Sequence, residues 1–200
     1  MNYKVIQRSE HRHLASIHLD AFHGFFLSSL GKRFLNAYYN AALNSNETIA
    51  VCAVDDDGQI QGFGTGCILS KGYHKQLILH HIFSFLYQGL IILLTNPKAL
   101  LRLAMNLDKI SNEKDDGNYA ELISIGVSHE FKGLGIGKAL IKIFEEEAKR
   151  KGCKKISLTT DYYDNEDVVA FYMHSGYNVF YEFTAYPKRR MYKLIKNLDS

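Results

Sequence analysis

The chain has 200 residues, a length that suits one domain with a single core and leaves little room for a second. Hydrophobic residues make up 46% and charged residues 22%, which is typical of a globular protein and argues against disorder. The formal net charge of +3 is small, and Lys and Arg are spread along the chain, so nucleic acid is not expected as the main partner. We therefore expect one domain over residues 1–200.

The first half of the chain predicts a strand, two helices and a hairpin. Residues 3–7 form the strand, and apolar side chains follow at helical spacing over about residues 10–38, with a break near Gly24. The stretch TIAVCAV (48–54) is rich in β-branched and small apolar residues. A DDDGQ turn joins it to a second extended stretch at 60–69, so the two form a β-hairpin.

The middle segment is unusually apolar, because residues 76–97 contain no Lys, Arg, Asp or Glu. That length suits a membrane span. However, the strands on either side should pair within one sheet, and a single crossing would separate them. Two histidines and a glutamine also disfavour a span. We therefore predict a two-helix insertion over residues 74–110, split at Pro97. Its apolar surface must pack on the domain, on a second subunit as in a homodimer, or on lipid as a peripheral contact.

The second half predicts the element order β-α-β-α-β-β. The stretch YAELISIGV (119–127) is apolar on both faces, as in a strand at the centre of a sheet. Helical spacing over residues 136–152 ends in glycine, and KKISLTTD (154–161) then predicts another strand. Residues 165–176 predict a helix, and residues 177–196 predict two closing strands around a proline. This order indicates an α/β fold with a parallel crossover.

Between the central strand and its helix lies KGLGIG (132–137), with glycine at every second position. The first N–H groups of a helix lack partners and lie at the positive end of its dipole, so a strand, a glycine loop and a helix can hold phosphate. The alternative is an ordinary turn whose glycines serve only the dihedral angles. Lys138 occupies the third glycine position of a dinucleotide fingerprint, and Ala139 replaces the Ser or Thr of a P-loop. An anion site of another kind is therefore predicted.

The loop resembles the acetyl-coenzyme A signature of the GNAT superfamily of N-acetyltransferases, Arg/Gln-x-x-Gly-x-Gly/Ala. The matching residues are Lys132, Gly133, Leu134, Gly135, Ile136 and Gly137. Lysine replaces the usual Arg or Gln, at little cost because that residue mainly lends its backbone N–H. A second family block lies downstream, at Asn165, Val168, Tyr172, Gly176 and Tyr177. The resemblance covers about residues 119–180, and the first half matches in element order only.

The resemblance implies an acyl-CoA N-acyltransferase fold: a central mixed β-sheet flanked by helices, with the helical insertion between the third and fourth strands. It implies acetyl transfer from acetyl-CoA, as co-substrate, to a primary amine, with a small molecule as the favoured acceptor. Backbone N–H groups of residues 133–138 would hold the diphosphate. Main-chain atoms of Ile125 and Val127 would pair with the pantetheine arm, which Asn165 would also bind. Tyr172 would be the general acid.

The residues alone leave alternatives open. Tyr172 lies in an apolar helical stretch where packing is the commoner role, and Asn165 also suits a helix N-cap. The alternative for Lys138 is an ordinary lysine in solvent on the first turn of the helix. Glu121, on the central strand, is the candidate base through a water molecule, with His129 as the alternative; Asp161 is a candidate to bind the acceptor amine. The rival class is a non-catalytic module that keeps the coenzyme A pocket or uses the insertion for protein contacts.

The cysteines indicate the compartment. Cys52, Cys67 and Cys153 are an odd number at wide spacing without a CxxC pair, so neither a disulfide framework nor a zinc site is indicated and no metal is expected. Residues 1–14 carry charge throughout and lack the apolar core of a signal peptide. We therefore predict reduced thiols and a cytoplasmic location.

Overall fold

A seven-stranded mixed sheet forms the centre of the computed structural model, which describes residues 1–105 and 115–198. The strands lie in the order β1-β2-β3-β4-β5-β7-β6, and β4 and β5 are parallel while the other described neighbours are antiparallel. The strands are β1 (Asn2–Val5), β2 (Thr48–Val54), β3 (Ile60–Cys67), β4 (Ala120–Val127), β5 (Lys155–Asp161), β6 (Asn178–Ala185) and β7 (Arg189–Asn197).

The helices fall into three groups along the chain. Before β2 lie η1 (Arg8–Glu10), α1 (His11–Ala21), α2 (Phe26–Ser29) and α3 (Gly31–Asn44). Between β3 and β4 lie α4 (Tyr73–His80), α5 (Ile82–Thr95) and α6 (Pro97–Met105). After β4 come η2 (His129–Phe131), α7 (Ile136–Arg150) and α8 (Glu166–His174). The prediction of a mixed sheet flanked by helices, with helices between the third and fourth strands, is confirmed.

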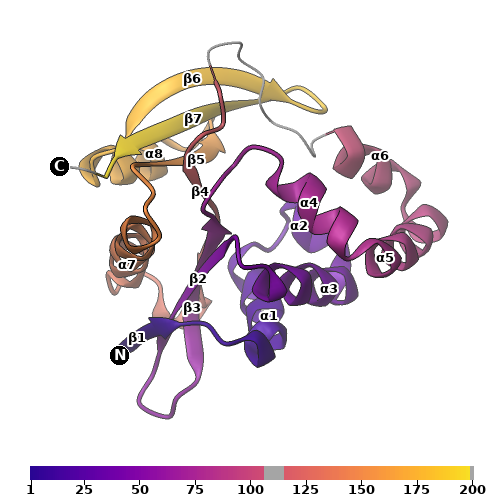
Figure 1. Cartoon of the computed structure of the whole chain (residues 1–200), viewed down its shortest axis with the longest axis horizontal. Helices are drawn as coiled ribbons and strands as arrows, with labels where there is room; N and C mark the ends of the chain where they lie inside the picture. The colour runs from indigo at the N-terminus through magenta and orange to yellow at the C-terminus, as the bar shows by residue number, and fades with distance from the viewer. Residues whose placement is uncertain (106–114, 199–200) are drawn as a thin grey trace.

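Helices cover both faces of the sheet (Figure 1), so there are two cores. On one face α1 and α3 pack over β2, β3 and β4 around Leu14 and Leu35. On the other face α7 packs on the same strands around Phe144. Alternate residues of β2 enter the two cores, with Cys52 toward α3 and Val51 toward α7. Because both faces are covered, the strand is apolar from Ile49 to Val54, as its sequence indicates.

The segment between β3 and β4 differs in detail from the two helices predicted. The break at Pro97 is confirmed, but the chain also bends by 96° at His81, between α4 and α5. No glycine or proline marks this bend. It allows Leu77 of α4 and Ile92 of α5 to reach the same core, which is a tertiary effect that local sequence does not encode. Residues 106–110 of the predicted insertion lie outside the described residues.

The helices of the described part of the chain are short. No single helix there has the length and apolar character to cross a bilayer. Helices α4 and α5 together have the length and composition of a membrane span, but the chain bends between them.

Candidate functional site

The sheet opens between its two parallel strands. The pairing of β4 with β5 begins at Ala120 opposite Ile156 and ends at Leu122 opposite Leu158, although both strands continue beyond that point. On its other side β4 stays paired with β3 as far as Val127. The outer half of β4 therefore presents a free main-chain edge toward β5, which a ligand of extended shape can pair with.

Main-chain groups of Ile125 and Val127 point into this opening. The next residue, Ser128, donates its N–H to the Gln61 carbonyl oxygen on the β3 side, at 2.8 Å. Because N–H and C=O groups alternate sides along a strand, those of Val127 and Ile125 face away from β3. This direction agrees with the roles predicted for both residues.

A cleft of about 450 Å³ lies at the opening. It is lined by four groups of residues: the end of α1, the outer part of β4, the loop from Phe131 to the start of α7, and residues of α8. The predicted site residues among them are Ile125, Val127, Lys132, Gly133, Gly135, Ile136, Gly137 and Tyr172. The others are Ala21, Phe22, Gly126, Phe131, Val168 and Phe171. The structure thus brings together residues that sequence reasoning placed in two separate motifs.

The glycine loop leaves helix N–H groups free. The first main-chain hydrogen bond of α7 runs from Ala139 N–H to the Gly135 oxygen at 3.1 Å, so the preceding N–H groups of residues 136–138 have no partner within the helix. Gly133 and Gly135 adopt φ of 81° and 76°, where other residues are strained. The backbone turn therefore explains two of the three alternating glycines, and the free N–H groups at the positive helix end favour an anion.

Gly137 has a different explanation. It lies inside α7 with ordinary helical backbone, and a Cβ there would meet no described atom within 4 Å. Neither strain nor packing within the described chain requires glycine, yet the residue lines the cleft. Gly137 thus leaves the helix backbone open to the cleft, and the residues present fit a diphosphate group.

Tyr172 lies on α8 and lines the cleft. Its side chain is 8% exposed and contacts the rings of Phe171 and Tyr177, with centroids 5.3 and 5.9 Å away. Burial raises the pKa of its hydroxyl to about 12. The side chain is therefore protonated at neutral pH and can donate a proton into the cleft, while its ring also packs in the core.

Asn165 precedes α8 but its side chain does not cap that helix. Its Nδ2 donates to Thr160 Oγ1 at 2.7 Å and to the Asp161 carbonyl oxygen at 3.0 Å, both on β5. The amide thus ties the start of α8 to the end of β5. Asn165 thus occupies the predicted N-cap position without a side-chain capping bond, and it is not among the residues that line the cleft.

Glu121, the candidate base, forms a buried ion pair. Lys193 Nζ donates to Oε1 at 2.8 Å and Ser70 Oγ donates to Oε2 at 2.5 Å. Burial acts to raise the pKa of this carboxyl, but the charge of Lys193 and the two hydrogen bonds outweigh it, so the pKa is lowered. Glu121 lies outside the set of residues that line the cleft. Sequence reasoning did not identify Lys193, which is 72 positions away.

The two further candidates, His129 and Asp161, also make contacts with other elements. The His129 main-chain N–H donates to Asp20 Oδ2 at 2.7 Å, which joins the end of β4 to α1. The Asp161 carboxylate forms a bidentate pair with Arg189 on β7. An Asp161 already neutralised by Arg189 is a weak candidate to bind a cationic acceptor.

The wall formed by α1 was not predicted from the sequence. Ala21 and Phe22, at the end of α1, line the cleft. Their position depends on Gly126 of β4, where a Cβ would lie 3.0 Å from the Phe22 ring and 3.1 Å from Ala21 Cβ. A glycine inside an apolar strand was the available signal, because it often marks close approach by another segment.

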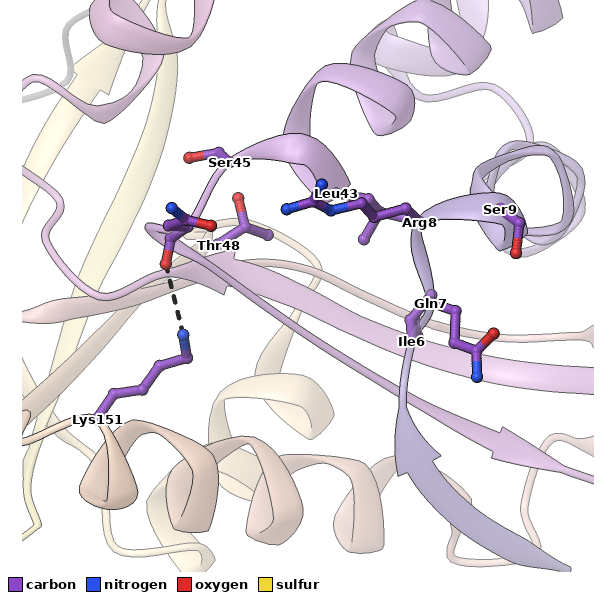
Figure 2. Close-up of a pocket in the computed structure, with 9 residues that line it drawn as sticks. Ile6, Gln7, Arg8, Ser9, Leu43, Ser45, Thr48 and Lys151 are labelled. Carbon is purple, nitrogen blue, oxygen red and sulfur yellow. Dashed lines mark hydrogen bonds between the residues drawn. The ribbon is translucent and has the colours of Figure 1, made fainter.

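A larger hollow of about 870 Å³ lies elsewhere, beyond the C-terminal end of α7. Figure 2 shows Lys151 reaching across it, and its Nζ donates to the Asn46 carbonyl oxygen at 3.4 Å. Its lining residues are Ile6, Gln7, Arg8, Ser9, Leu43, Ser45, Asn46, Thr48 and Lys151. None of the predicted site residues lies there, so the smaller cleft is the candidate site.

The protein is thus an α/β domain whose mixed sheet has an open edge beside a helix N-terminus. Such a cleft suits a ligand that has an extended arm and an anionic group. The sequence model of the acetyltransferase (GNAT) family matches residues 12–177. The chain therefore belongs to this family. No curated protein sequence matches it at a significant level.

Solved structures share the fold. The ribosomal-protein-S18-alanine N-acetyltransferase from Escherichia coli has a TM-score of 0.63 and 12% identity, covering 100% of this chain and 94% of its own. Aminoglycoside 6'-acetyltransferase type Ii has a TM-score of 0.64 and 17% identity, covering 100% and 99%. An aminoglycoside 6'-N-acetyltransferase complexed with coenzyme A has a TM-score of 0.62 and 16% identity, covering 100% and 98%. At these identities the likeness establishes the GNAT fold.

Proposed function

We propose that the protein transfers an acetyl group from acetyl-CoA to a primary amine on a small molecule. The observation that carries the proposal is the free main-chain edge of β4 beyond Leu122, which leads to the unpartnered N–H groups at the start of α7. An extended arm with a diphosphate fits both features at once. Family membership makes acetyl transfer the expected reaction class, and one structural neighbour is a coenzyme A complex.

The binding roles follow from the arrangement. Main-chain groups of Ile125 and Val127 would pair with the amide-bearing arm of the co-substrate. The N–H groups of residues 133–138 would bind the diphosphate, and the exposed Lys132 and Lys138 add positive charge beside it. Leu134, 69% exposed at the tip of the loop, lends only its backbone to this site.

The chemical step needs a neutral amine, an activated acyl group and a proton for the leaving thiolate. Acetyl-CoA supplies the activated acyl group as a thioester. An N–H of β4 facing the cleft can polarise its carbonyl. Tyr172 lines the cleft and is protonated at neutral pH, so it is our candidate for the proton donor.

Glu121 remains our candidate base, although the ion pair limits how it can act. A free primary amine of pKa about 10.4 must lose a proton before it attacks. Glu121 is ionised, as a base must be, but its oxygens accept hydrogen bonds from Lys193 and Ser70. It can take a proton only through a relay that one of these groups joins. The same ion pair is the observation that favours the alternative function, a non-catalytic acyl-CoA-binding module.

Release of free thiol from acetyl-CoA separates the two functions. The amine panel should contain an aminoglycoside, a polyamine and a peptide with N-terminal alanine, so that small-molecule and protein acceptors are compared. Amine-dependent thiol release supports the enzyme, and preference for a small amine supports the acceptor class. Calorimetry with coenzyme A tests the site itself. Binding of coenzyme A without turnover on any amine would support the alternative function, a non-catalytic binding module. A cytoplasmic location stays a prediction.

A further inference from the structure

Helix α5 turns its apolar side outward. Its exposed large apolar residues recur at the spacing of one helix face: Phe83, Leu86, Tyr87, Leu90, Leu93 and Leu94. Phe83 is 84% exposed and Leu94 is 78% exposed. The buried residues of the helix include a polar one, Gln88, beside Ile92. In a helix on the surface of a domain in water the apolar stripe faces the core, so this helix carries a second apolar stripe with no cover among the described residues.

The neighbouring helices extend this surface, which we call the α5 face. Leu79 at the end of α4 is 59% exposed, and Leu101 and Met105 on α6 are 53% and 59% exposed. Figure 1 shows α5 and α6 at the edge of the molecule, on the far side of α3 from the sheet and away from α7 and α8. The patch thus lies on a projecting part of the fold, where a large flat partner can reach it.

Within the described helices α4 to α6, the ionic side chains are all basic. Between Asp57 and Asp108 the sequence contains no acidic residue, although the chain as a whole has 21. Its ionic side chains there are basic: Lys71, Lys75, Lys98 and Arg102. Lys75 and Lys98 are exposed on α4 and α6, the helices that flank α5. A two-fold dimer through this face would set copies of the same basic rim against each other. An anionic surface meets it with opposite charge.

We propose that the α5 face docks the protein on a membrane that contains anionic phospholipid. The exposed Phe and Leu side chains enter the boundary between headgroups and acyl chains, and the flanking lysines contact lipid phosphate or carboxylate groups. Helix α5 has 14 residues, so it is about 21 Å long, less than the hydrocarbon thickness of about 30 Å. It therefore lies in the interface and does not cross it.

Flotation of the full chain with vesicles tests this docking. Vesicles of phosphatidylcholine alone are compared with vesicles in which about one third of the lipid is phosphatidylserine. We expect the protein to float with the anionic vesicles, at least about tenfold more than with neutral ones, and to be released by added salt. Protein that stays at the bottom with anionic vesicles, or that floats equally with both, overturns the proposal.

Paired variants separate the apolar contribution from the charge. Combining Phe83→Glu with Leu94→Glu should lower the floated fraction about tenfold or more, since both side chains are exposed and the changes leave the core intact. The matched control combines Val5→Glu with Val179→Glu, two exposed apolar residues on β1 and β6, and should float like the parent. Equal flotation of the α5 variant and the parent overturns the proposal.

The charge variants follow the same design. Lys75→Glu with Lys98→Glu should lower flotation on anionic vesicles, whereas Lys142→Glu with Lys149→Glu, exposed on α7, should not. Melting temperatures show that each variant is folded. Sedimentation over a range of protein concentrations tests whether a second copy of the chain occupies the α5 face instead. A dimer that the Phe83→Glu and Leu94→Glu variant dissociates, together with no flotation of the parent, assigns the face to a second copy and overturns membrane docking.

Discussion

Lys193 Nζ donates to Glu121 Oε1 at 2.8 Å, and the two side chains are only 3% and 13% exposed. Glu121 lies on β4 and Lys193 on β7, so the pair passes across β5, which separates these strands in the sheet. It lies next to Leu122, the last residue at which β4 and β5 are paired. The ion pair therefore links β4 and β7, the two neighbours of β5, where the sheet begins to open.

Removing the lysine should destabilise the fold. In Lys193→Met the Glu121 carboxylate loses its charged partner while remaining buried, so the free energy of unfolding should fall by about 3–5 kcal/mol in urea titrations at neutral pH. The double variant with Glu121→Leu should regain most of this loss, because no buried charge remains unpaired. The exposed pair of Arg150 and Glu147 is the control, and Arg150→Met should cost no more than about 1 kcal/mol. A double variant no more stable than Lys193→Met would contradict this account.

Tyr172→Phe should separate catalysis from binding. The ring contacts with Phe171 and Tyr177 are kept, so coenzyme A affinity and melting temperature should stay near the parent values. Turnover should fall about 10²–10⁴-fold if the hydroxyl protonates the leaving thiolate. Because its pKa is about 12, Tyr172 keeps its proton across the physiological range, and the parent should show no loss of kcat from this group below about pH 11. Tyr163→Phe, at a 62% exposed position, is the matched control. Equal rates for Tyr172→Phe and the parent would remove the role.

The predictable part of the fold consists of segments whose own residues determine their structure. The stretches 48–54 and 119–127 read as strands because apolar residues occupy successive positions on both faces, and each contains a strand whose residues enter both cores. The glycine loop was predictable because its spacing matches both a helix start and a family motif. Tyr172 followed from its distance to Asn165.

The remainder depends on contacts between distant segments. The bend at His81 has no local signal and follows from burying parts of α4 and α5 in one core. The cleft wall at Phe22 was missed because it arises from packing against Gly126, which is 104 positions later in the chain. The partner of Glu121 was missed for the same reason, since Lys193 reaches it from another strand.

His18 should make stability depend on pH. It lies buried on α1, where its Nδ1 shares a 2.7 Å hydrogen bond with the Tyr39 hydroxyl and its Nε2 has no partner among the described groups. Burial lowers its pKa from 6.5 to about 4. Between pH 6.5 and pH 4 the imidazole of His18 is therefore protonated in the unfolded chain but neutral in the folded chain. The free energy of unfolding should fall as the pH drops through this range, by about 3 kcal/mol in total.

Urea unfolding at several pH values measures this dependence for the parent, His18→Gln and His13→Gln. The His18→Gln variant should be less stable overall but should show a flatter pH dependence between 6.5 and 4, because no buried imidazole titrates there. His13 lies exposed on the same helix, so His13→Gln should keep the slope of the parent. An unchanged slope in His18→Gln would show that other groups cause the effect.

Gly137→Ala should raise or preserve stability while it weakens coenzyme A binding. The added methyl group meets no described atom within 4 Å, and alanine favours a helix over glycine by up to about 1 kcal/mol. If the diphosphate lies on the backbone here, the same methyl group pushes it away from the free N–H groups, and affinity should fall about 10- to 100-fold. Gly89→Ala is the matched control, since Gly89 lies inside α5 with the same open space and lies outside the cleft. It should raise or preserve stability with no change in affinity. Calorimetry and thermal melts measure both quantities, and equal affinities of the two variants would mean that the ligand does not approach α7 at Gly137.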